Sequence, residues 1–437
     1  MIKKTRALED ALKLSHIERE ELIVPVPEYL LITTDNARCP KAEVFIHEGD
    51  YVKLGQPIGV RHGGFFDQPI HATCSGTFEG YEKHYHRSGK VVSFMKIHND
   101  FKDALYEGIK PRSQEEIDAL TRDQVVEILK NCASVGLGGS SFPTYVKFQT
   151  KTKINTVLID GVECEPYINA DHRALMEEPD HILDGMKLVK HIFGVNDVRL
   201  CFKKKYKDIE ATYEKLFAKE PHDGISYFEV PNVYPMGWEN RLVEQATKIH
   251  VEPGKRPADY GVMVINASTL LGIRLALREN MPVYQRRVTV TGDGIVKPSD
   301  FFVRVGTPVK YLIEKCGGYK DPDKPKTFIL GGPMMGASLP SDDCILTKTV
   351  TSVIVINKRN YLEEPCIRCG SCVASCPVGL LPVDIMNAMK HMPVDKAKVK
   401  MLNPLKCIEC GLCAYSCTSN INVTDYVRRA KVIARLK

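Results

Sequence analysis

The chain has 437 residues, of which 43% are hydrophobic and 26% charged, and its formal net charge is +6. This length allows three or four globular domains. No apolar run is long enough to predict a membrane-spanning helix, and no signal-peptide core is present. Basic and aromatic residues do not interleave, which argues against nucleic-acid binding. We therefore expect a cytoplasmic protein, or one docked through partners on the cytoplasmic face of the inner membrane.

Residues 1–24 read as a charged amphipathic segment, and residues 25–110 are predicted to form a small β domain. Two stretches alternate apolar and polar residues around turns, VFIHEGDYVKLGQPIG at 44–59 and IHATCSGTF at 70–78. Both resemble halves of a biotinyl/lipoyl-type hammerhead, the barrel-sandwich hybrid. The lysine that such carrier domains present at a hairpin tip is missing between them. We therefore expect a structural module and not a swinging arm.

Residues 111–285 alternate strand-like and helical patterns, which predicts an α/β domain with a mainly parallel sheet. The first helix is expected to begin after Thr121, a good N-cap residue. A buried strand, TVLIDG at 156–161, follows. The alternation is typical of a Rossmann-like nucleotide-binding domain.

The segment GLGGSSFPTYVK, residues 136–147, is a candidate phosphate loop. Glycines let a backbone approach phosphate closely, and Ser140 or Ser141 could cap the next helix, with Pro143 in its first turn. Lys147 could supply a counter-charge. The segment fails the dinucleotide fingerprint, because a helix precedes it where a strand is required. A flexible interhelical turn is the alternative interpretation.

A second candidate lies directly after the strand TVLIDG, in the sequence VECEPYINADHR. Glu163, Glu165 and Tyr167 follow the carboxyl end of that strand, the edge where open α/β sheets bind ligands. Ordinary surface charges or a helix-cap region are the alternative interpretation. The glycine loop followed about twenty residues later by ECEPY is more specific than either motif alone.

Residues 286–358 resemble a soluble-ligand-binding β-grasp (SLBB) domain, and residues 359–437 carry two copies of the pattern C-x2-C-x2-C-x3-C. This spacing is that of bacterial ferredoxins with 4Fe–4S clusters. Gly370 and Gly411 leave room for backbone N–H groups to approach inorganic sulfide. Zinc knuckles or a disulfide framework are the alternatives, but zinc needs only four ligands. The eight predicted ligands are Cys366, Cys369, Cys372, Cys376, Cys407, Cys410, Cys413 and Cys417.

The fourth cysteine of each run is predicted to ligate the other cluster, as in two-cluster ferredoxins. One cluster would then take Cys366, Cys369, Cys372 and Cys417, and the other Cys407, Cys410, Cys413 and Cys376. The seven remaining cysteines are scattered singly, which indicates a reducing compartment.

From about residue 25 to its end, the chain resembles the RnfC family, the C subunits of the Rnf electron-transport complex, in the order of its modules. The middle is also similar to the flavin subunit of respiratory complex I. The resemblance implies FMN and NADH as ligands, with no side chain acting as nucleophile or general base. It implies that flavin phosphate is surrounded by Gly136, Gly138, Gly139 and Lys147, with Ser140 and Asn266 nearby. Asp160, Glu163, Glu165 and Tyr167 would line the isoalloxazine and nicotinamide side.

The expected function is an NADH-oxidising oxidoreductase subunit that passes electrons through FMN and two 4Fe–4S clusters to a partner. The partner would be an Rnf-type NADH:ferredoxin complex, or a soluble system such as methylenetetrahydrofolate reductase or cobalamin reductase. The alternative is a non-enzymatic iron–sulfur scaffold with a vestigial flavin site. Ser141 and Asp160 motivate that alternative. Ser141 adds a side chain near the proposed FMN, and Asp160 replaces the usual asparagine.

Overall fold

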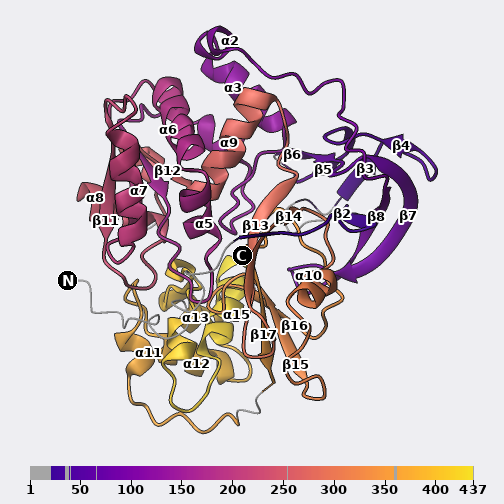
Figure 1. The fold of residues 1–437 in the computed structure, drawn as a ribbon. Helices are drawn as coiled ribbons and strands as arrows, with labels where there is room; N and C mark the ends of the chain where they lie inside the picture. Colours follow the sequence, from indigo (N-terminus) through magenta and orange to yellow (C-terminus); the bar gives the residue numbers. More distant parts are fainter. Residues whose placement is uncertain are drawn as a thin grey trace.

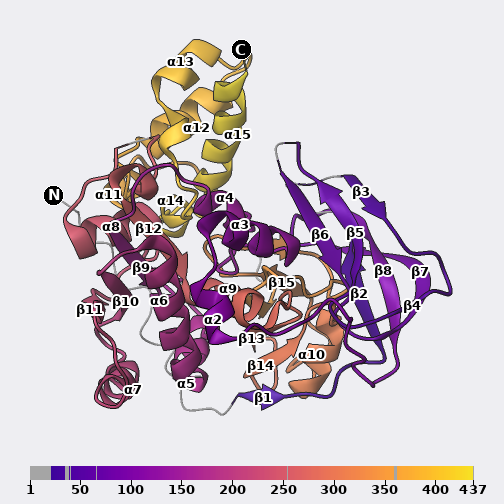
Figure 2. The same ribbon diagram turned by 90° about the horizontal axis from the view of Figure 1, so that it is seen from above.

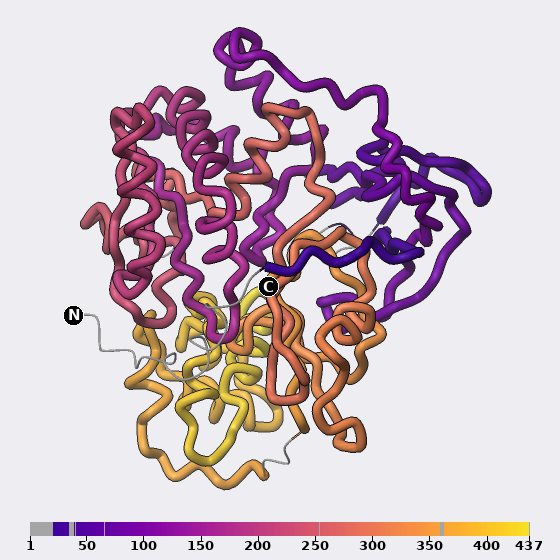
Figure 3. Tube along the Cα trace, in the orientation of Figure 1, coloured from indigo at the N-terminus to yellow at the C-terminus, as the bar shows by residue number. Residues whose placement is uncertain are grey.

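The computed structural model describes residues 21–34, 39, 41–64, 66–252, 254–358 and 362–436. The predicted amphipathic segment at 1–24 therefore lies outside the described residues as far as residue 20. Four modules follow one another along the chain, and the ribbon and the Cα trace separate them by colour (Figures 1 and 3). This order confirms the predicted multidomain α/β and α+β fold class, while the domain boundaries drawn from the sequence stay predictions.

The first module is a barrel-sandwich hybrid built from two antiparallel sheets. Alternating apolar residues of both sheets meet in one core that contains Leu30, Ile58, Ile70 and Phe78. The four-stranded sheet has the order β2 (Tyr29–Thr33), β8 (Val91–Asn99), β7 (Gly76–Tyr85) and β4 (Tyr51–Val52). The three-stranded sheet has the order β3 (Lys41–Val44), β5 (Pro57–His62) and β6 (Asp67–His71).

The second module contains a four-stranded sheet whose strands are all parallel, as the sequence predicted. Its order is β11 (Ile225–Val230), β10 (Val198–Lys203), β9 (Thr156–Asp160) and β12 (Val262–Asn266). Strand β9 ends at Asp160 and β12 ends at Asn266, and these two residues are partners in the register. The carboxyl ends of two adjacent strands therefore meet where a ligand is expected.

Helices cover both faces of this parallel sheet, and the cap predicted at Thr121 is present. Thr121 caps α3 and forms a capping box with Gln124, and Asn266 caps α9 by accepting from the N–H of Thr269. The helices of this module are α2 (Gln114–Asp118), α3 (Arg122–Asn131), α4 (Thr144–Phe148), α5 (Ala170–Glu177), α6 (Pro179–Phe193), α7 (Lys207–Phe217), α8 (Glu239–Thr247) and α9 (Ala267–Glu279).

The third module is a mixed six-stranded sheet with helix α10 (Val309–Lys315) packed on it, the β-grasp arrangement that the sequence predicted. Its edge strand β1 (Leu22–Ile23) comes from the beginning of the described chain and pairs in parallel with β14, so that the indigo strand runs beside the orange sheet (Figure 3). The sheet has the order β1, β14 (Ser299–Arg304), β13 (Gln285–Thr291), β17 (Ser352–Asn357), β15 (Lys326–Leu330) and β16 (Ala337–Leu339).

The last module is helical within its described residues and projects away from the hammerhead (Figure 2). Two single-turn helices, α11 (Ser371–Ala374) and α14 (Leu412–Tyr415), lie inside the two cysteine runs. The longer helices that pack around a small apolar core are α12 (Pro382–Lys390), α13 (Lys396–Met401) and α15 (Val423–Arg435). No helix in the described part of the chain is long and apolar enough to span a bilayer.

Candidate functional site

A cavity of about 790 Å³ lies where the modules meet, a volume within the usual range for small-molecule and cofactor sites. All four modules contribute to its wall. The hammerhead provides Arg61, His71 and Arg87, and the glycine loop provides Gly138, Gly139, Ser140 and Ser141. The parallel sheet and its loops provide Asp160, Glu163, Glu165, Trp238, Glu239 and Asn266, while the β-grasp and cluster modules provide Gly332, Met335, Lys348, Ile408 and Glu409.

The glycine loop forms part of this wall, and its glycines are needed for two different reasons. Gly139 has a φ of +103°, which side chains rarely adopt, and a Cβ there would meet no atom within 4 Å. Its backbone therefore borders open space that a ligand could fill. Gly136 does not line the cavity, and a Cβ on it would lie 2.1 Å from the hydroxyl of Ser140, so it lets the turn pack closely. A Cβ on Gly138 would lie 3.0 Å from the side chain of Asn266.

The helix after the loop differs from the sequence prediction. Helix α4 has only five residues, and its N-cap is Pro143, with no side-chain cap hydrogen bond. The prediction that Ser140 or Ser141 caps this helix, with Pro143 in the first turn, is therefore wrong. Ser140 lies in the turn itself, and its hydroxyl accepts from the N–H of Phe142 at 3.4 Å. A single helical turn offers little dipole to an anion.

Lys147 does not line the cavity. Its ammonium group contacts the carboxylate of Glu239 and lies 3.2 Å from the carbonyl oxygen of Val264. The charge that the sequence assigned to a flavin phosphate is therefore paired with a protein carboxylate in this structure. Tyr167, another predicted cofactor residue, also lies outside the cavity wall, in a left-handed backbone conformation with a φ of +70°.

Both carboxylates of the ECEP segment line the cavity, and both bind backbone N–H groups of neighbouring segments. Glu163 accepts from the N–H groups of Asp171 and His172, at 2.9 and 3.4 Å, and so satisfies the first turn of α5. Glu165 accepts from the N–H groups of Met334 and Met335, at 3.0 and 2.9 Å. The ECEP segment therefore ties the parallel sheet to the β-grasp loop at residues 331–336.

We expect Glu165→Ala to lower the free energy of unfolding by about 2 kcal/mol, because hydrogen bonds to a charged acceptor are lost and two N–H groups need new partners. Thermal unfolding followed by circular dichroism checks this. Glu220→Ala is the matched control, since it removes a carboxylate whose partner is the surface residue Lys187, a pair of small expected value. Equal melting temperatures for the two variants would contradict the tying role of Glu165.

Asp160 and Asn266, at the ends of adjacent strands, share a polar network on the cavity wall. The amide of Asn266 donates to Asp171 at 2.7 Å and to the carbonyl oxygen of Asp160 at 3.3 Å. Burial, together with the charges of Asp171 and Glu239, raises the pKa of Asp160 to about 7. Near neutral pH the Asp160 carboxyl group is thus about half protonated and can donate a hydrogen bond. A protonated Asp160 can both donate and accept hydrogen bonds, as the asparagine that is usual at this position does.

The cysteines of the last module gather in two groups that cross between the runs. Four of them, Cys366, Cys369, Cys372 and Cys417, line one small cavity of about 30 Å³. In the other group, burial and the neighbouring charges of Cys407 and Cys376 raise the pKa of the Cys413 thiol to about 11. Cys376 thus lies with the second run and Cys417 with the first, the arrangement that crossed ligation would require, and the ligation itself stays a prediction.

The donor set of these groups fits iron–sulfur clusters. Thiols placed so close together repel as thiolates, and bound iron would supply the compensating charge. Backbone N–H groups already point at sulfur: Leu380 donates to Cys376 and Glu409 to Cys407, both at 3.3 Å. Each run also has a left-handed glycine at the same position, Gly370 and Gly411, with a φ of +77° in both.

The second-run group borders the nucleotide-sized cavity. Ile408 and Glu409, which lie between two of its cysteines, form part of the cavity wall. The hydroxyl of Tyr234 donates to the carbonyl oxygen of Cys410 at 2.8 Å, and a Cβ on Gly411 would lie 2.8 Å from the carbonyl oxygen of Met334. The first-run group faces outward, since Cys366 and Cys369 are exposed.

Comparison with known proteins identifies each module. Residues 15–102 match the RnfC barrel sandwich hybrid domain, 129–274 the Nuo51 FMN-binding domain, 287–338 the SLBB domain and 365–421 the 4Fe-4S dicluster domain. The C subunit of the Na(+)-translocating ferredoxin:NAD(+) oxidoreductase complex of Acetobacterium woodii is 33% identical, over 85% of this chain and 84% of its own length. The chain belongs to the RnfC family.

Other RnfC relatives are similar over the same region. The C subunit of the ion-translocating oxidoreductase complex of Yersinia pseudotuberculosis is 34% identical over 82% of this chain, but the match spans only 51% of that protein. The C subunit of the proton-translocating ferredoxin:NAD(+) oxidoreductase complex of Clostridium ljungdahlii is 31% identical over 82% of this chain and 78% of its own. A solved NAD+-reducing [NiFe]-hydrogenase is only distantly similar, with a TM-score of 0.48 and 16% identity over 72% of this chain and 61% of its own.

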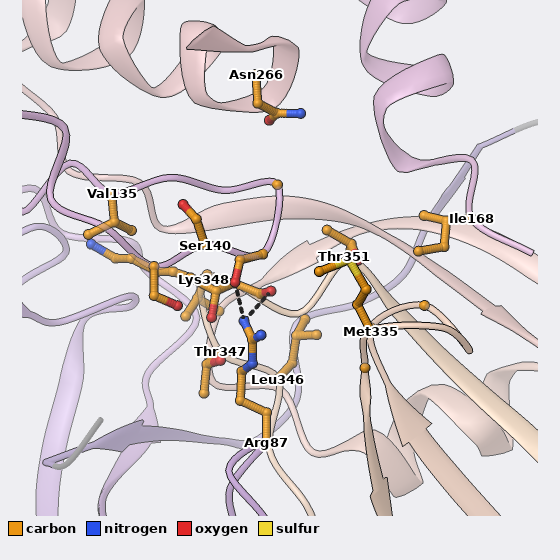
Figure 4. Close-up of a pocket in the computed structure, with 18 of the residues that line it drawn as sticks. Arg87, Val135, Ser140, Ile168, Asn266, Met335, Leu346, Thr347, Lys348 and Thr351 are labelled. Atoms are coloured by element: carbon orange, nitrogen blue, oxygen red, sulfur yellow. Dashed lines mark hydrogen bonds between the residues drawn. The ribbon is translucent and has the colours of Figure 1, made fainter. Parts of the chain in front are cut away.

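Sequence reasoning placed the RnfC cavity between the glycine loop and the ECEP segment, and it missed the wall formed by the hammerhead and the β-grasp module. The close-up of the cavity shows Arg87 from the hammerhead and Thr347 and Lys348 from the β-grasp module near the loop residue Ser140, and Thr351 beside Met335 (Figure 4). Contacts between modules leave no local periodicity in the sequence. Two blocks that the sequence does carry, YPMGWE at 234–239 and GGPMMG at 331–336, contribute to the wall.

Proposed function

We propose that this RnfC-family chain is the electron-input subunit of a larger complex, in which NADH is oxidised at FMN in the central cavity. When bound, FMN accepts a hydride from NADH, and the two 4Fe–4S clusters carry electrons one at a time. One observation supports this proposal most directly. Ile408 and Glu409, two residues of the second cysteine run, lie in the wall of a nucleotide-sized cavity. The cavity in which FMN would accept electrons and the cysteine group whose cluster would carry them away therefore lie next to each other.

The roles of individual residues follow from where they lie. Gly138, Gly139 and Ser140 would bring backbone N–H groups to the flavin. Asp160 would hold a proton on its carboxyl oxygen and donate it in a hydrogen bond toward the ring side of the cavity. Asn266 would act by fixing Asp171 and Asp160.

The remaining predicted residues would act indirectly. The negative charges of Glu163 and Glu165 would disfavour a further negative charge on a ligand group nearby. Their hydrogen bonds to backbone N–H groups would hold the cavity wall in place. Gly136, Lys147 and Tyr167 lie outside the cavity wall and would serve by shaping the loops that carry the others.

The two cysteine groups would bind the clusters in the crossed pattern. Electrons would pass first to the second-run cluster and then to the first-run cluster. Tyr234 and Met334 would exclude water between the cavity and the second-run group by packing against Cys410 and Gly411. The exposed Cys366 and Cys369 would bring the first-run cluster to the surface, where a partner could accept electrons.

The partner would be the membrane part of an Rnf-type complex or a soluble reductase such as a methylenetetrahydrofolate or cobalamin reductase. The names of the relatives favour a multisubunit oxidoreductase complex. Under the first setting, the chain would sit on the cytoplasmic face of the inner membrane. Identification of copurifying proteins by mass spectrometry separates the two settings.

The full chain, purified without oxygen, is expected to contain FMN as well as iron and sulfide for two 4Fe–4S clusters. Addition of NADH should bleach the visible absorbance of both, because the cavity adjoins the second-run cysteines. Absorption spectra with flavin and iron analysis provide the measurement. Full iron content with no flavin and no bleaching by NADH would favour the alternative, an iron–sulfur scaffold with a vestigial flavin site.

A further inference from the structure

The wall that the hammerhead and β-grasp modules contribute to the cavity carries a separate group of cationic and hydrogen-bonding side chains. Arg61 comes from β5, His71 ends β6, and Lys348 lies in the loop between β16 and β17. Lys348 and Thr347 lie on the side of the cavity that holds Val135 and Ser140, while Ile168 and Met335 lie on the other side (Figure 4). The cavity therefore has a cationic region as well as the acidic region around Asp160.

His71 is buried, with 7% of its surface exposed, and the backbone of Asn131 lies close enough to favour its protonated form slightly. The Nδ1 atom of its ring is buried and has no hydrogen-bond partner in the described part of the chain. Burial and the positive charges of Lys348 and Arg61 lower the pKa of His71 to about 3. The cationic side chains therefore lie close enough to keep the imidazole neutral at neutral pH. A bound anion would offset the charges of Lys348 and Arg61 and favour the protonated ring, which could then donate a hydrogen bond to that anion.

Lys348 is positioned by its backbone and leaves its ammonium group available. Its carbonyl oxygen accepts a hydrogen bond from Arg286. Burial and the charge of Arg61 lower the pKa of Lys348 to about 8. Among the described residues, no carboxylate or carbonyl group pairs with its Nζ, whereas Lys147 is paired with Glu239. The hydroxyl of the adjacent Thr347, also on the cavity wall, has no partner in the same part of the chain.

A cluster of like charges in a partly buried cavity is unfavourable unless a ligand offsets it, because burial and mutual repulsion both disfavour the charged forms. A phosphate group offers the negative charge and several acceptor oxygens at once. We propose that Lys348, His71 and Arg61 form a subsite for a phosphate group of the nucleotide bound in the cavity. The inference rests on the proposed function, and either the phosphate of FMN or the pyrophosphate of NADH supplies this chemistry.

This subsite gives the hammerhead a binding role and assigns the phosphate counter-charge to Lys348 rather than to Lys147. It also explains why the cavity has a cationic region apart from the acidic region around Asp160. The charged groups that act on the pKa of Asp160 include Asp171, Glu239 and Lys147, none of which belongs to the cationic cluster. A nucleotide with its phosphate at one side and its ring at the other matches this separation.

The test compares four forms of the full-length chain with its clusters in place: wild type, Lys348→Met, Lys348→Arg and Lys147→Met. Affinities for FMN and for riboflavin, which lacks the phosphate, are measured by fluorescence quenching after flavin removal. The KM for NADH is measured with a dye acceptor. Iron content and melting temperature report on folding, and if Lys348→Met lowers either of them, His71→Gln takes its place.

We expect Lys348→Met to remove one charge-assisted contact, a loss of at least about tenfold in affinity, and Lys348→Arg to restore most of it. If flavin phosphate is the ligand, FMN affinity falls while riboflavin affinity does not. If NADH pyrophosphate is the ligand, FMN affinity is unchanged and the KM for NADH rises. Lys147→Met should not change the preference for FMN over riboflavin, because its ammonium group is paired with Glu239 and lies outside the cavity wall.

Three results would overturn the subsite. Lys348→Met could leave FMN affinity and the KM for NADH unchanged, or FMN and riboflavin could weaken equally, or Lys147→Met could abolish the preference for FMN while Lys348→Met preserves it. In each of these cases the wild-type chain still binds FMN, so the proposed function stands. A wild-type chain that binds no flavin and oxidises no NADH would overturn both.

Discussion

Cys376→Ser is expected to remove the cluster that borders the cavity, although Cys376 belongs to the first cysteine run. The structure places this residue with the second run, since its charge acts on Cys407, Cys410 and Cys413. The variant should lose roughly half of the iron, and electrons from NADH should no longer reach the surviving cluster. Iron analysis and electron paramagnetic resonance after reduction with dithionite or NADH provide the measurement.

Two reference variants make this result unambiguous. Cys410→Ser affects the second-run cluster and Cys369→Ser the first-run cluster, whichever way the fourth cysteines are shared. With crossed ligation, the spectrum of Cys376→Ser matches that of Cys410→Ser, and the spectrum of Cys417→Ser matches that of Cys369→Ser. The reverse pairing would disprove crossed ligation.

The predictable parts of this chain are those that a local pattern determines. Cysteine spacing gave all eight candidate ligands, and the alternation of apolar runs gave the parallel sheet and the strand at 156–161, which ends at Asp160 in the structure. The Thr121 cap was also visible, because capping depends on a few adjacent residues.

The parts that the sequence did not predict depend on contacts between distant segments. Lys147 lies in the expected loop, but its partner Glu239 is 92 residues away, and nothing local indicates that pairing. Arg61, His71 and Lys348 come from two modules and become neighbours only in the assembled cavity. The helix-cap role given to Ser140 or Ser141 failed because the short helix α4 begins at Thr144, with Pro143 as its N-cap.

Asp160→Asn is expected to stabilise the protein, and to do so more at high pH. Burial is the largest cause that raises the pKa of Asp160, from 3.8 to about 7, and the charges of Asp171 and Glu239 add to it. Between these two pH values the folded chain holds a proton that the unfolded chain releases, so the carboxyl group lowers stability as the pH rises. The full cost, above pH 7, is on the order of 4 kcal/mol. Asparagine avoids it because it does not ionise.

The dependence on pH, more than the absolute gain, tests this account. Linkage predicts that the gain from Asp160→Asn is about 2 to 3 kcal/mol larger at pH 8 than at pH 5, measured as the difference in thermal unfolding between variant and wild type. Asp208→Asn is the control of opposite sign: burial would raise the pKa of Asp208, but its hydrogen bond to His172 lowers it. Removing that carboxylate should cost stability at pH 8 and little at low pH, because the depressed pKa stabilises the fold only where the unfolded carboxyl group is ionised. A gain for Asp160→Asn that is the same at both pH values would mean that the side chain is ionised in the fold throughout, and that it cannot donate a hydrogen bond into the cavity.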